Sequence, residues 1–411
     1  MRKFCVTFLS LISLVSVSAF AVDGTPVRLG GGALTGGIPG SGSLKIAEVE
    51  AWLNNPENHL ALEVELPPAL QSGKSQIYIP TDNPLTRAKV ELGRQIFFDK
   101  RFSKNAEVSC ADCHHPSFGY AKDTQFGVGV GGQTGNRNSP VAYNRILSKE
   151  QFWDGRADSL EAQAIGPIAN PIEMTFSHEL AVTLVSENKI YRKQFDKVFG
   201  RVPTIDDIGR AIASFERVLV TGDSAYDSNE PFIKLKEVFA DDLEDLDAFK
   251  TDDPELFAKY TKLKAAADAN PLSESAIRGR KLFFSAKANC AACHVGANFT
   301  DEKYHNLGVG MTAEKPDLGR EATTGNAADR GAFKTPTLRN VALTAPYMHD
   351  GSQKTLEEVV EWYAIGGHPN PNLSDKIKKF DATAQDKADL VEFMKALTGT
   401  LPEVEVARLP E

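Results

Sequence analysis

The sequence has few cysteines, no excess of positive charge and, beyond its N-terminus, no long hydrophobic run. Its 411 residues contain 46 Lys and Arg against 55 Asp and Glu, so the charge balance gives no indication of nucleic-acid binding. With 42% hydrophobic and 25% charged residues, the composition is that of a soluble globular protein and excludes a disordered or collagen-like chain. The five cysteines are an odd number, so disulfides alone would leave one over.

The N-terminus, residues 1–21, has the pattern of an export signal. A short basic start is followed by the apolar stretch from Phe4 to Val17 and by Ala19-Phe20-Ala21, which is typical of a cleavage site. A membrane anchor is the alternative, but the apolar stretch is shorter than the roughly 20 residues that a spanning helix needs. We predict cleavage after Ala21 and a periplasmic mature protein without a membrane span. Cys5 then leaves with the signal.

The four remaining cysteines form two CxxCH motifs, Cys110-Ala-Asp-Cys113-His114 and Cys290-Ala-Ala-Cys293-His294. CxxCH is the attachment signature of c-type haem, in which two thiols bind the haem and the adjacent histidine reaches the iron. A zinc site, a redox disulfide and structural disulfides are alternatives, but none explains a histidine after both second cysteines. We therefore predict two covalently bound haems.

The two motifs lie within an internal repeat. Before each motif, an Asn-Pro-Leu segment (Asn83 to Leu85, and Asn270 to Leu272) opens an amphipathic helix, with Asn as the predicted N-cap. After each motif, residues 140–160 parallel residues 336–356 without a gap. We predict a mainly α protein with little β-structure. Its expected parts are an N-terminal extension (22–80) and two c-type cytochrome-like domains (81–265 and 266–411).

Other segments carry less information. The predictions for them are a flexible Gly-rich stretch (22–44), solvated acidic helices (223–269), a loop that is a candidate docking surface (314–332) and a closing amphipathic helix (383–397).

The repeat predicts that the two haem sites are unequal. Its register pairs residues of different chemistry: Gln163 with Val359, Pro167 with Tyr363, and Phe152 with Met348. Tyr363 is a candidate phenolate ligand of the second iron, whereas Pro167 cannot ligate and leaves the first iron open. Two alternatives remain, a core role for Tyr363 and ligation by the Met348 thioether, a common partner of c-type haem.

Over about residues 80 to 400, the chain resembles the bacterial dihaem cytochrome c peroxidases and their relative MauG, which matures a tryptophan-derived cofactor. The resemblance rests on several motifs together: the two CxxCH sites, Phe152-Trp153-Asp154-Gly155-Arg156-Ala157, Gly166-Pro167-Ile168, Asn170-Pro171-Ile172-Glu173-Met174, Thr335-Pro336-Thr337-Leu338-Arg339-Asn340 and Ala345-Pro346-Tyr347-Met348-His349-Asp350-Gly351.

The resemblance implies a role for individual residues. It makes the first domain the peroxide-reacting one and the second the domain through which electrons enter. The implied roles are proximal iron ligands (His114 and His294), a distal acid–base residue (Glu173), a distal amide (Gln163), a tryptophan between the haems (Trp153) and oxygen ligands of a calcium ion (Asn138, Thr344 and Pro346).

Two departures from the ordinary peroxidases point to the MauG-like branch. The family's histidine on the loop after the first motif is missing, because residues 125–136 contain none. The family's methionine ligand to the second iron is replaced by Tyr363, as in MauG. We expect a peroxidase that reduces hydrogen peroxide with electrons from a small c-type cytochrome or cupredoxin. The alternatives are a MauG-like oxidant of a partner protein and a non-catalytic dihaem electron carrier.

Overall fold

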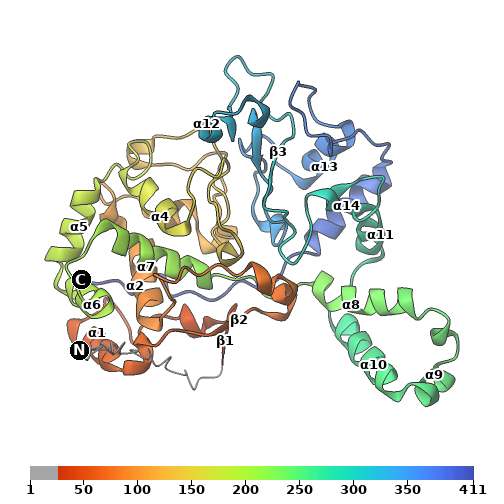
Figure 1. Cartoon of the computed structure of the whole chain (residues 1–411), viewed down its shortest axis with the longest axis horizontal. Helices are drawn as coiled ribbons and strands as arrows, with labels where there is room; N and C mark the ends of the chain where they lie inside the picture. The colour runs from red at the N-terminus through yellow and green to blue at the C-terminus, as the bar shows by residue number, and fades with distance from the viewer. Residues whose placement is uncertain (1–25) are drawn as a thin grey trace, which may run out of the picture.

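The computed structural model describes residues 26–411, which form two mainly helical lobes and a projecting helical hairpin (Figure 1). The predicted signal peptide therefore lies outside the described residues. Within them, the β-structure consists of two small sheets, one parallel and one antiparallel. The prediction of a mainly α protein with little β-structure is confirmed. The strands are β1 (Val27–Arg28), β2 (Val64–Glu65), β3 (Tyr304–Asn306) and β4 (Ala332–Lys334).

The first lobe is built on the crossing of helices α2 and α7. The helices meet at Gly93, where a Cβ atom would lie 1.9 Å from the carbonyl oxygen of Ala211. Only glycine allows this approach, and the rings of Phe97 and Phe215 fill the space beside it. The helices of this lobe are α1 (Ile46–Asn54), α2 (Arg87–Phe98), α3 (Cys110–Cys113), α4 (Leu160–Ala169), α5 (His178–Glu187), α6 (Lys189–Phe199) and α7 (Ile205–Val218).

The second lobe repeats this crossing with α11 and α14. A Cβ atom at Gly279 would lie 1.9 Å from the carbonyl oxygen of Asp389, so glycine is again required. Helices α4 and α13 also occupy the same positions of the repeat, and both begin at a hydroxyl N-cap, Ser159 and Thr355. The register of the predicted repeat is thus confirmed. The helices here are α11 (Glu274–Phe283), α12 (Glu321–Thr324), α13 (Leu356–Ile365) and α14 (Ala384–Lys395), the last within the predicted closing helix.

The predicted asparagine N-caps are wrong. The hydroxyls of Thr86 and Ser273 cap α2 and α11 instead. Asn83 is fully buried, and its amide donates a hydrogen bond of 2.7 Å to the Glu161 carboxylate on α4. Its side chain therefore serves a tertiary contact that the local pattern does not reveal. Asn270 likewise lies before the start of α11.

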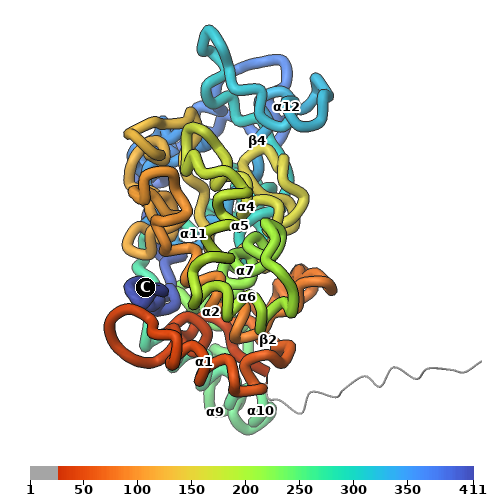
Figure 2. The backbone as a smooth tube through the Cα atoms, turned by 90° about the vertical axis from the view of Figure 1, so that its left-hand side faces the viewer, coloured from red at the N-terminus to blue at the C-terminus, as the bar shows by residue number. Residues whose placement is uncertain are grey.

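The prediction that residues 22–44 are flexible is also wrong for the part that the structure describes. Leu29 and Leu34 join the core of the first lobe, and Ile38 and Leu44 pack in a small core with α1. The C-terminal tail, residues 401–411, returns to the first lobe and pairs with this segment (Figure 2). Apolar residues spaced along a Gly-rich segment are enough to fix it when a second chain segment covers them.

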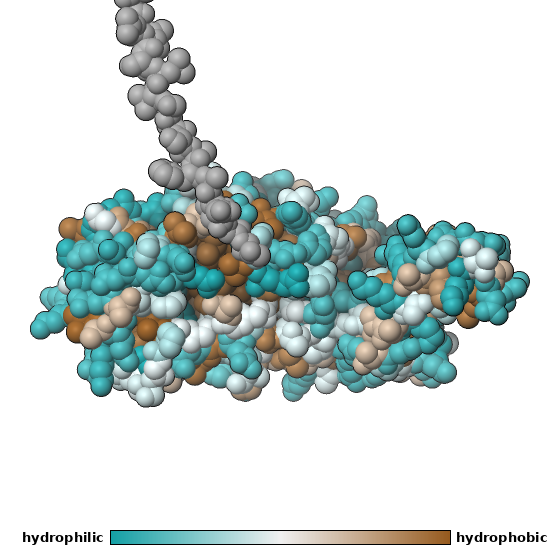
Figure 3. Space-filling model, turned by 90° about the horizontal axis from the view of Figure 1, so that it is seen from below, coloured by the Kyte–Doolittle hydropathy of each residue, from teal (hydrophilic) through white to brown (hydrophobic). Residues whose placement is uncertain are grey.

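The projecting hairpin confirms the prediction of solvated helices in residues 223–269. It carries its own aromatic cluster of Phe249, Phe257 and Tyr260, and its surface is mostly hydrophilic (Figure 3). Among residues 26–411, no helix combines the length and apolar character that a membrane span requires. The hairpin consists of α8 (Ala225–Val238), α9 (Leu246–Asp252) and α10 (Pro254–Ala269).

Candidate functional site

A cavity lined mainly by the second lobe, with some residues of the first, brings together the residues of the second CxxCH motif; it is called the second-lobe cavity below. Cys290 and Cys293 are free thiols on its wall, and His294 lies beside them. The Nδ1 atom of His294 is 3.0 Å from the carbonyl oxygen of Phe299, which leaves Nε2 for a metal ion. These groups have the chemistry that covalent haem attachment requires.

Two candidate sixth ligands, Tyr363 on α13 and Met348, also line this cavity. Burial raises the pKa of the Tyr363 hydroxyl, and the nearby thiols of Cys290 and Cys293 add to this effect. A buried hydroxyl with a raised pKa needs a strong Lewis acid to become a phenolate, and a ferric iron is one. The geometry keeps both candidates in place, so the choice between them remains a prediction.

The first CxxCH motif has the same local geometry. Helix α3 carries Cys110 and Cys113 as free thiols, and Nδ1 of His114 is 3.3 Å from the carbonyl oxygen of Tyr120. Burial lowers the pKa of both His114 and His294, which favours the neutral imidazole that binds metals. The two lobes therefore present matching proximal arrangements.

Glu173 lies near the first motif, and its role as a distal acid–base group stays a prediction. Its carboxylate accepts a hydrogen bond of 2.9 Å from the Asn170 amide, and its charge reaches the Cys113 thiol. Burial raises the pKa of the Glu173 carboxyl, while Arg156 and Asn170 partly oppose that rise. Gln163 and Pro167 lie four residues apart on α4, hence on one face of that helix.

The loop formed by residues 125–136 covers this region closely. A Cβ atom at Gly127 would lie 3.0 Å from the Cys113 sulfur, and one at Gly129 would lie 2.2 Å from the carbonyl oxygen of Ile172. The loop also binds the Glu173 segment, because the Val130 N–H donates to the Glu173 carbonyl oxygen at 2.8 Å. Gly127 and Gly129 therefore allow this histidine-free loop to pack closely against the first motif.

Trp153 lies at the contact between the lobes. Its indole N–H donates to the Asn138 carbonyl oxygen at 2.8 Å, and its own carbonyl oxygen accepts from the Lys334 N–H of the second lobe at 2.8 Å. Arg137 ties the next residue, Asp154, to Asp317, with ion-pair distances of 2.6 and 2.7 Å. Both lobes therefore fix the position of the indole, which also lines the second-lobe cavity.

The three predicted calcium ligands line the same cavity as Trp153. Asn138 comes from the first lobe, and Thr344 and Pro346 come from the second. The Asn138 amide nitrogen donates to the Gln125 carbonyl oxygen at 3.1 Å, so the side-chain oxygen is the atom left for a cation. Oxygen donors of this kind suit calcium.

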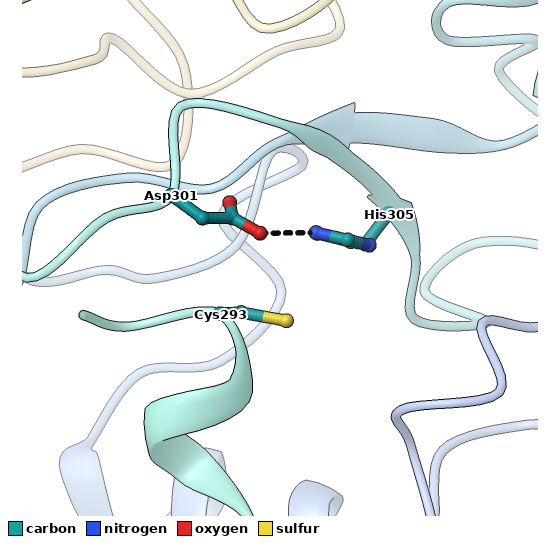
Figure 4. A group of neighbouring side chains, drawn as sticks. All are labelled: Cys293, Asp301 and His305. Carbon is teal, nitrogen blue, oxygen red and sulfur yellow. Dashed lines mark hydrogen bonds and ion pairs between the residues drawn. The ribbon is translucent and has the colours of Figure 1, made fainter.

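The sequence analysis missed an ion pair between Asp301 and His305, of which His305 lines the cavity (Figure 4). The His305 Nε2 atom is 2.8 Å from the Asp301 carboxylate, and both lie within 4.8 Å of the Cys293 sulfur. The three groups have the chemistry of a metal site, but a thioether bond to haem would use up the Cys293 thiolate. In the sequence, the only sign of this pair is its four-residue spacing, which is too common to indicate a site.

Comparisons with known proteins agree with this arrangement. The family model described as di-haem cytochrome c peroxidase matches residues 87–230, and the cytochrome c model matches residues 276–398. The methylamine utilization protein MauG of Methylorubrum extorquens is 36% identical, over 80% of this chain and 84% of its own. The cytochrome c551 peroxidase of Nitrosomonas europaea is 36% identical, over 78% of this chain and 83% of its own.

Solved structures show the same architecture. A MauG-like protein associated with microbial copper homeostasis is 31% identical, with a TM-score of 0.63 over 78% of this chain and 92% of its own. The dihaem peroxidase BthA from Burkholderia thailandensis, at 21% identity and a TM-score of 0.60, covers 77% of this chain and 87% of its own. The latter similarity concerns the fold alone.

Proposed function

Because this chain belongs to the family of dihaem cytochrome c peroxidases and MauG, oxidoreductases with haem cofactors, we propose that it reduces hydrogen peroxide to water. Each turnover converts one HOOH, two electrons and two protons into two water molecules. A small redox protein, a c-type cytochrome or a cupredoxin, donates the electrons one at a time at the second lobe. We also propose that the chain acts in the periplasm after cleavage at Ala21.

One observation carries this proposal, the difference between the two lobes at matching positions of α4 and α13. Cys110, Cys113 and His114 hold the first haem in the proposed arrangement, and Cys290, Cys293 and His294 hold the second. The position of the repeat that carries Tyr363 on α13 carries Pro167 on α4, and the side chain of Pro167 has no donor atom. One site is thus open to a small ligand, and the other has a potential protein ligand.

Glu173 is the residue that moves the proton. When bound, the first haem supplies the open iron position for peroxide and the electrons that split its O–O bond. The Glu173 carboxylate accepts the proton from the inner oxygen of HOOH and returns it to the outer oxygen, which leaves as water. Gln163 orients the peroxide by a hydrogen bond from its amide. The carboxylate is partly buried, and this burial raises its pKa.

Trp153 provides the route between the lobes. Its ring lines the cavity of the second motif, while its hydrogen bond to Asn138 holds it in the first lobe. Because the indole N–H is bonded to a backbone carbonyl and not to a base, electron loss from the ring leaves its proton in place. The relay is therefore reversible without net proton transfer.

Peroxide turnover with a reduced c-type cytochrome tests the proposal. Glu173→Gln keeps an oxygen for the Asn170 hydrogen bond but removes the base, so the reaction with peroxide should slow by about 10²- to 10⁴-fold. Glu179→Gln, at an exposed position on α5, is the matched control and should react like the parent protein. Equal rates for the Glu173 variant and the parent, with both haems present, would remove Glu173 from the mechanism.

A second candidate function, the oxidation of residues on a partner protein, is favoured by Tyr363. A phenolate stabilises higher oxidation states of iron, whereas a thioether favours the reduced state. Oxidising equivalents would then spread over both sites through Trp153. Slow turnover with small cytochromes, combined with peroxide-dependent cross-linking or hydroxylation of a co-expressed protein, would favour this role. Fast turnover without protein modification would exclude it.

The proposal includes a calcium ion at Asn138, Thr344 and Pro346. The ion would join the lobes beside Trp153, since these residues come from both lobes. Elemental analysis of the purified protein before and after chelation tests this part. Absence of calcium in both samples, together with unchanged activity, would contradict it.

A further inference from the structure

Arg145 is a residue of the first lobe at the cavity of the second CxxCH motif. It follows Asn144, whose positive φ of 58° turns the chain at the start of a short 3-10 turn, Arg145–Leu147. Its side chain lines the cavity that contains Cys290 and His294. The same lining includes Pro140 of the first lobe and Lys334 of the second, so Arg145 lies where residues of the two lobes meet.

Arg145 is partly buried, and its guanidinium lacks the carboxylate partner that three fully buried arginines have. Its Nε atom is buried without a hydrogen-bond partner among residues 26–411, and within that range no carboxylate lies within 4.0 Å of the guanidinium. Three other arginines of the protein interior each hold a carboxylate: Arg94 with Glu91 at 2.7 Å, Arg217 with Glu161 at 2.5 Å, and Arg339 with Asp227 at 2.8 Å. An unpaired cation at a cavity wall is costly unless an anion occupies the cavity.

The protein groups around Arg145 do not supply that anion. Burial raises the pKa of the Glu216 carboxyl to about 8, so this neighbour is largely neutral at pH 7. Glu302 is engaged by Lys334 at 2.6 Å. Lys334 lines the same cavity, and its pKa is lowered by burial and further by the charge of Arg145, so it offers Arg145 no negative charge. The surroundings of the Arg145 guanidinium therefore favour a negatively charged ligand.

We propose that Arg145 binds a propionate carboxylate of the haem held in the second-lobe cavity. The planar guanidinium offers paired N–H donors that match a carboxylate, and the propionates are the anionic groups of haem. A fixed cation at that edge favours the less positive, reduced state of the haem iron. Arg145 therefore raises the reduction potential of the electron-entry haem and eases electron transfer from the donor protein.

The proposal rests on haem attachment at Cys290 and Cys293, so the test begins with the haem content of the full-length holoprotein. The variants are Arg145→Gln and Arg145→Lys, with the surface residue Arg192→Gln as control. Two haems per chain in every sample establish that the variants are loaded. If the parent protein itself contains no second haem, the result counts against the proposed function.

Redox titration of each haem and vibrational spectra of the propionates give the decisive readouts. Arg145→Gln should shift the potential of the second haem to more negative values and shift its propionate bands. Arg145→Lys should keep most of the potential, because the charge remains, but still shift the bands, because paired hydrogen bonds are lost. The Arg192 control should change neither. These spectra do not depend on catalytic turnover.

Unchanged propionate bands in both loaded variants would overturn the proposal. A shift confined to the first haem would overturn the assignment to the second-lobe cavity. If Arg145→Gln does not accumulate as folded protein, the Lys variant decides alone, since a structural role predicts unchanged propionate bands and the proposal predicts a shift.

Discussion

The two lobes have the same backbone conformation at corresponding positions but different side chains near the two CxxCH motifs. The matched positive φ angles show this agreement: Asn144 (58°) with Asn340 (56°), Phe152 (68°) with Met348 (69°), and Gly155 (66°) with Gly351 (61°). Isolated β-bridges also match, Gln151 with Ala157 in one lobe and Tyr347 with Gln353 in the other. The repeat is therefore a property of the backbone and not only of the sequence.

The differences lie where chemistry would take place. Pro167 and Tyr363 occupy one helical position, and Trp153 and His349 occupy one loop position. The ring of His349 stacks on Phe333 at 3.5 Å, and burial lowers its pKa to about 4. The second lobe thus places a neutral, packed ring where the first places an indole. The two lobes therefore differ in these side chains but keep the helix crossings at Gly93 and Gly279.

Removal of one cysteine pair at a time should have the largest effect on this comparison. The double variant Cys110→Ala/Cys113→Ala should lose the first haem and all reaction with peroxide. The double variant Cys290→Ala/Cys293→Ala should lose the second haem but keep a single reaction with peroxide, without sustained turnover from a protein donor. Intact mass and the haem assay count the cofactors. Two haems in either variant would contradict the attachment sites.

Substitution of the candidate sixth ligands should change one haem only. Tyr363→Phe removes the phenolate, so the second haem should become high-spin in the electron paramagnetic resonance spectrum of the oxidised protein. Met348→Leu serves as the matched control on the same cavity wall and should leave the spectrum unchanged. The opposite result would assign ligation to Met348 and move the protein to the His/Met type.

The sequence predicted the parts of the structure that depend on spacing. CxxCH is read locally, and the register of α4 against α13 follows from a repeat without gaps, so Tyr363 was placed correctly on its helix. Glu173 was placed beside the first motif because a specific motif carries it. In both cases, short-range pattern and tertiary position coincide.

The parts that depend on distant partners escaped prediction. Asn83 has a good N-cap sequence, but Glu161 from α4 takes its side chain. The Gly-rich N-terminal segment is ordered by the C-terminal tail, which lies at the other end of the sequence. Arg145 belongs to no recognisable motif, and only the structure shows that its guanidinium lacks a carboxylate partner. Such contacts are set by the packed fold and leave no local signal.

Substitution of Arg156 should shift the pH dependence of the first site by a moderate amount. Glu173 must be ionised to accept a proton, so the rate of reaction with peroxide should fall as the pH drops through its raised pKa. Arg156 lowers that pKa, and Arg156→Gln should therefore move the falling limb to higher pH. Stopped-flow rates across the pH range test this, and the limb should be absent in Glu173→Gln. An unmoved limb would show that another group controls it.

The smallest expected effect concerns stability, and it follows from the same pKa. Folding raises the pKa of Glu173, so the folded state binds the proton more tightly than the unfolded chain. The stabilising contribution is complete below the unfolded pKa and is lost as the pH rises through the folded value. Each unit of increase corresponds to about 1.4 kcal/mol.

Glu173→Gln is neutral at every pH, so its free energy of unfolding relative to the parent should increase from acid to neutral pH. Denaturant unfolding of both proteins at several pH values measures this difference, with Glu179→Gln as the exposed control that shows no such increase. If the variant is less stable than the parent at neutral pH, the ionised carboxylate must be stabilised by more than its interaction with Arg156. The first site would then be built to keep Glu173 charged, and not to desolvate it.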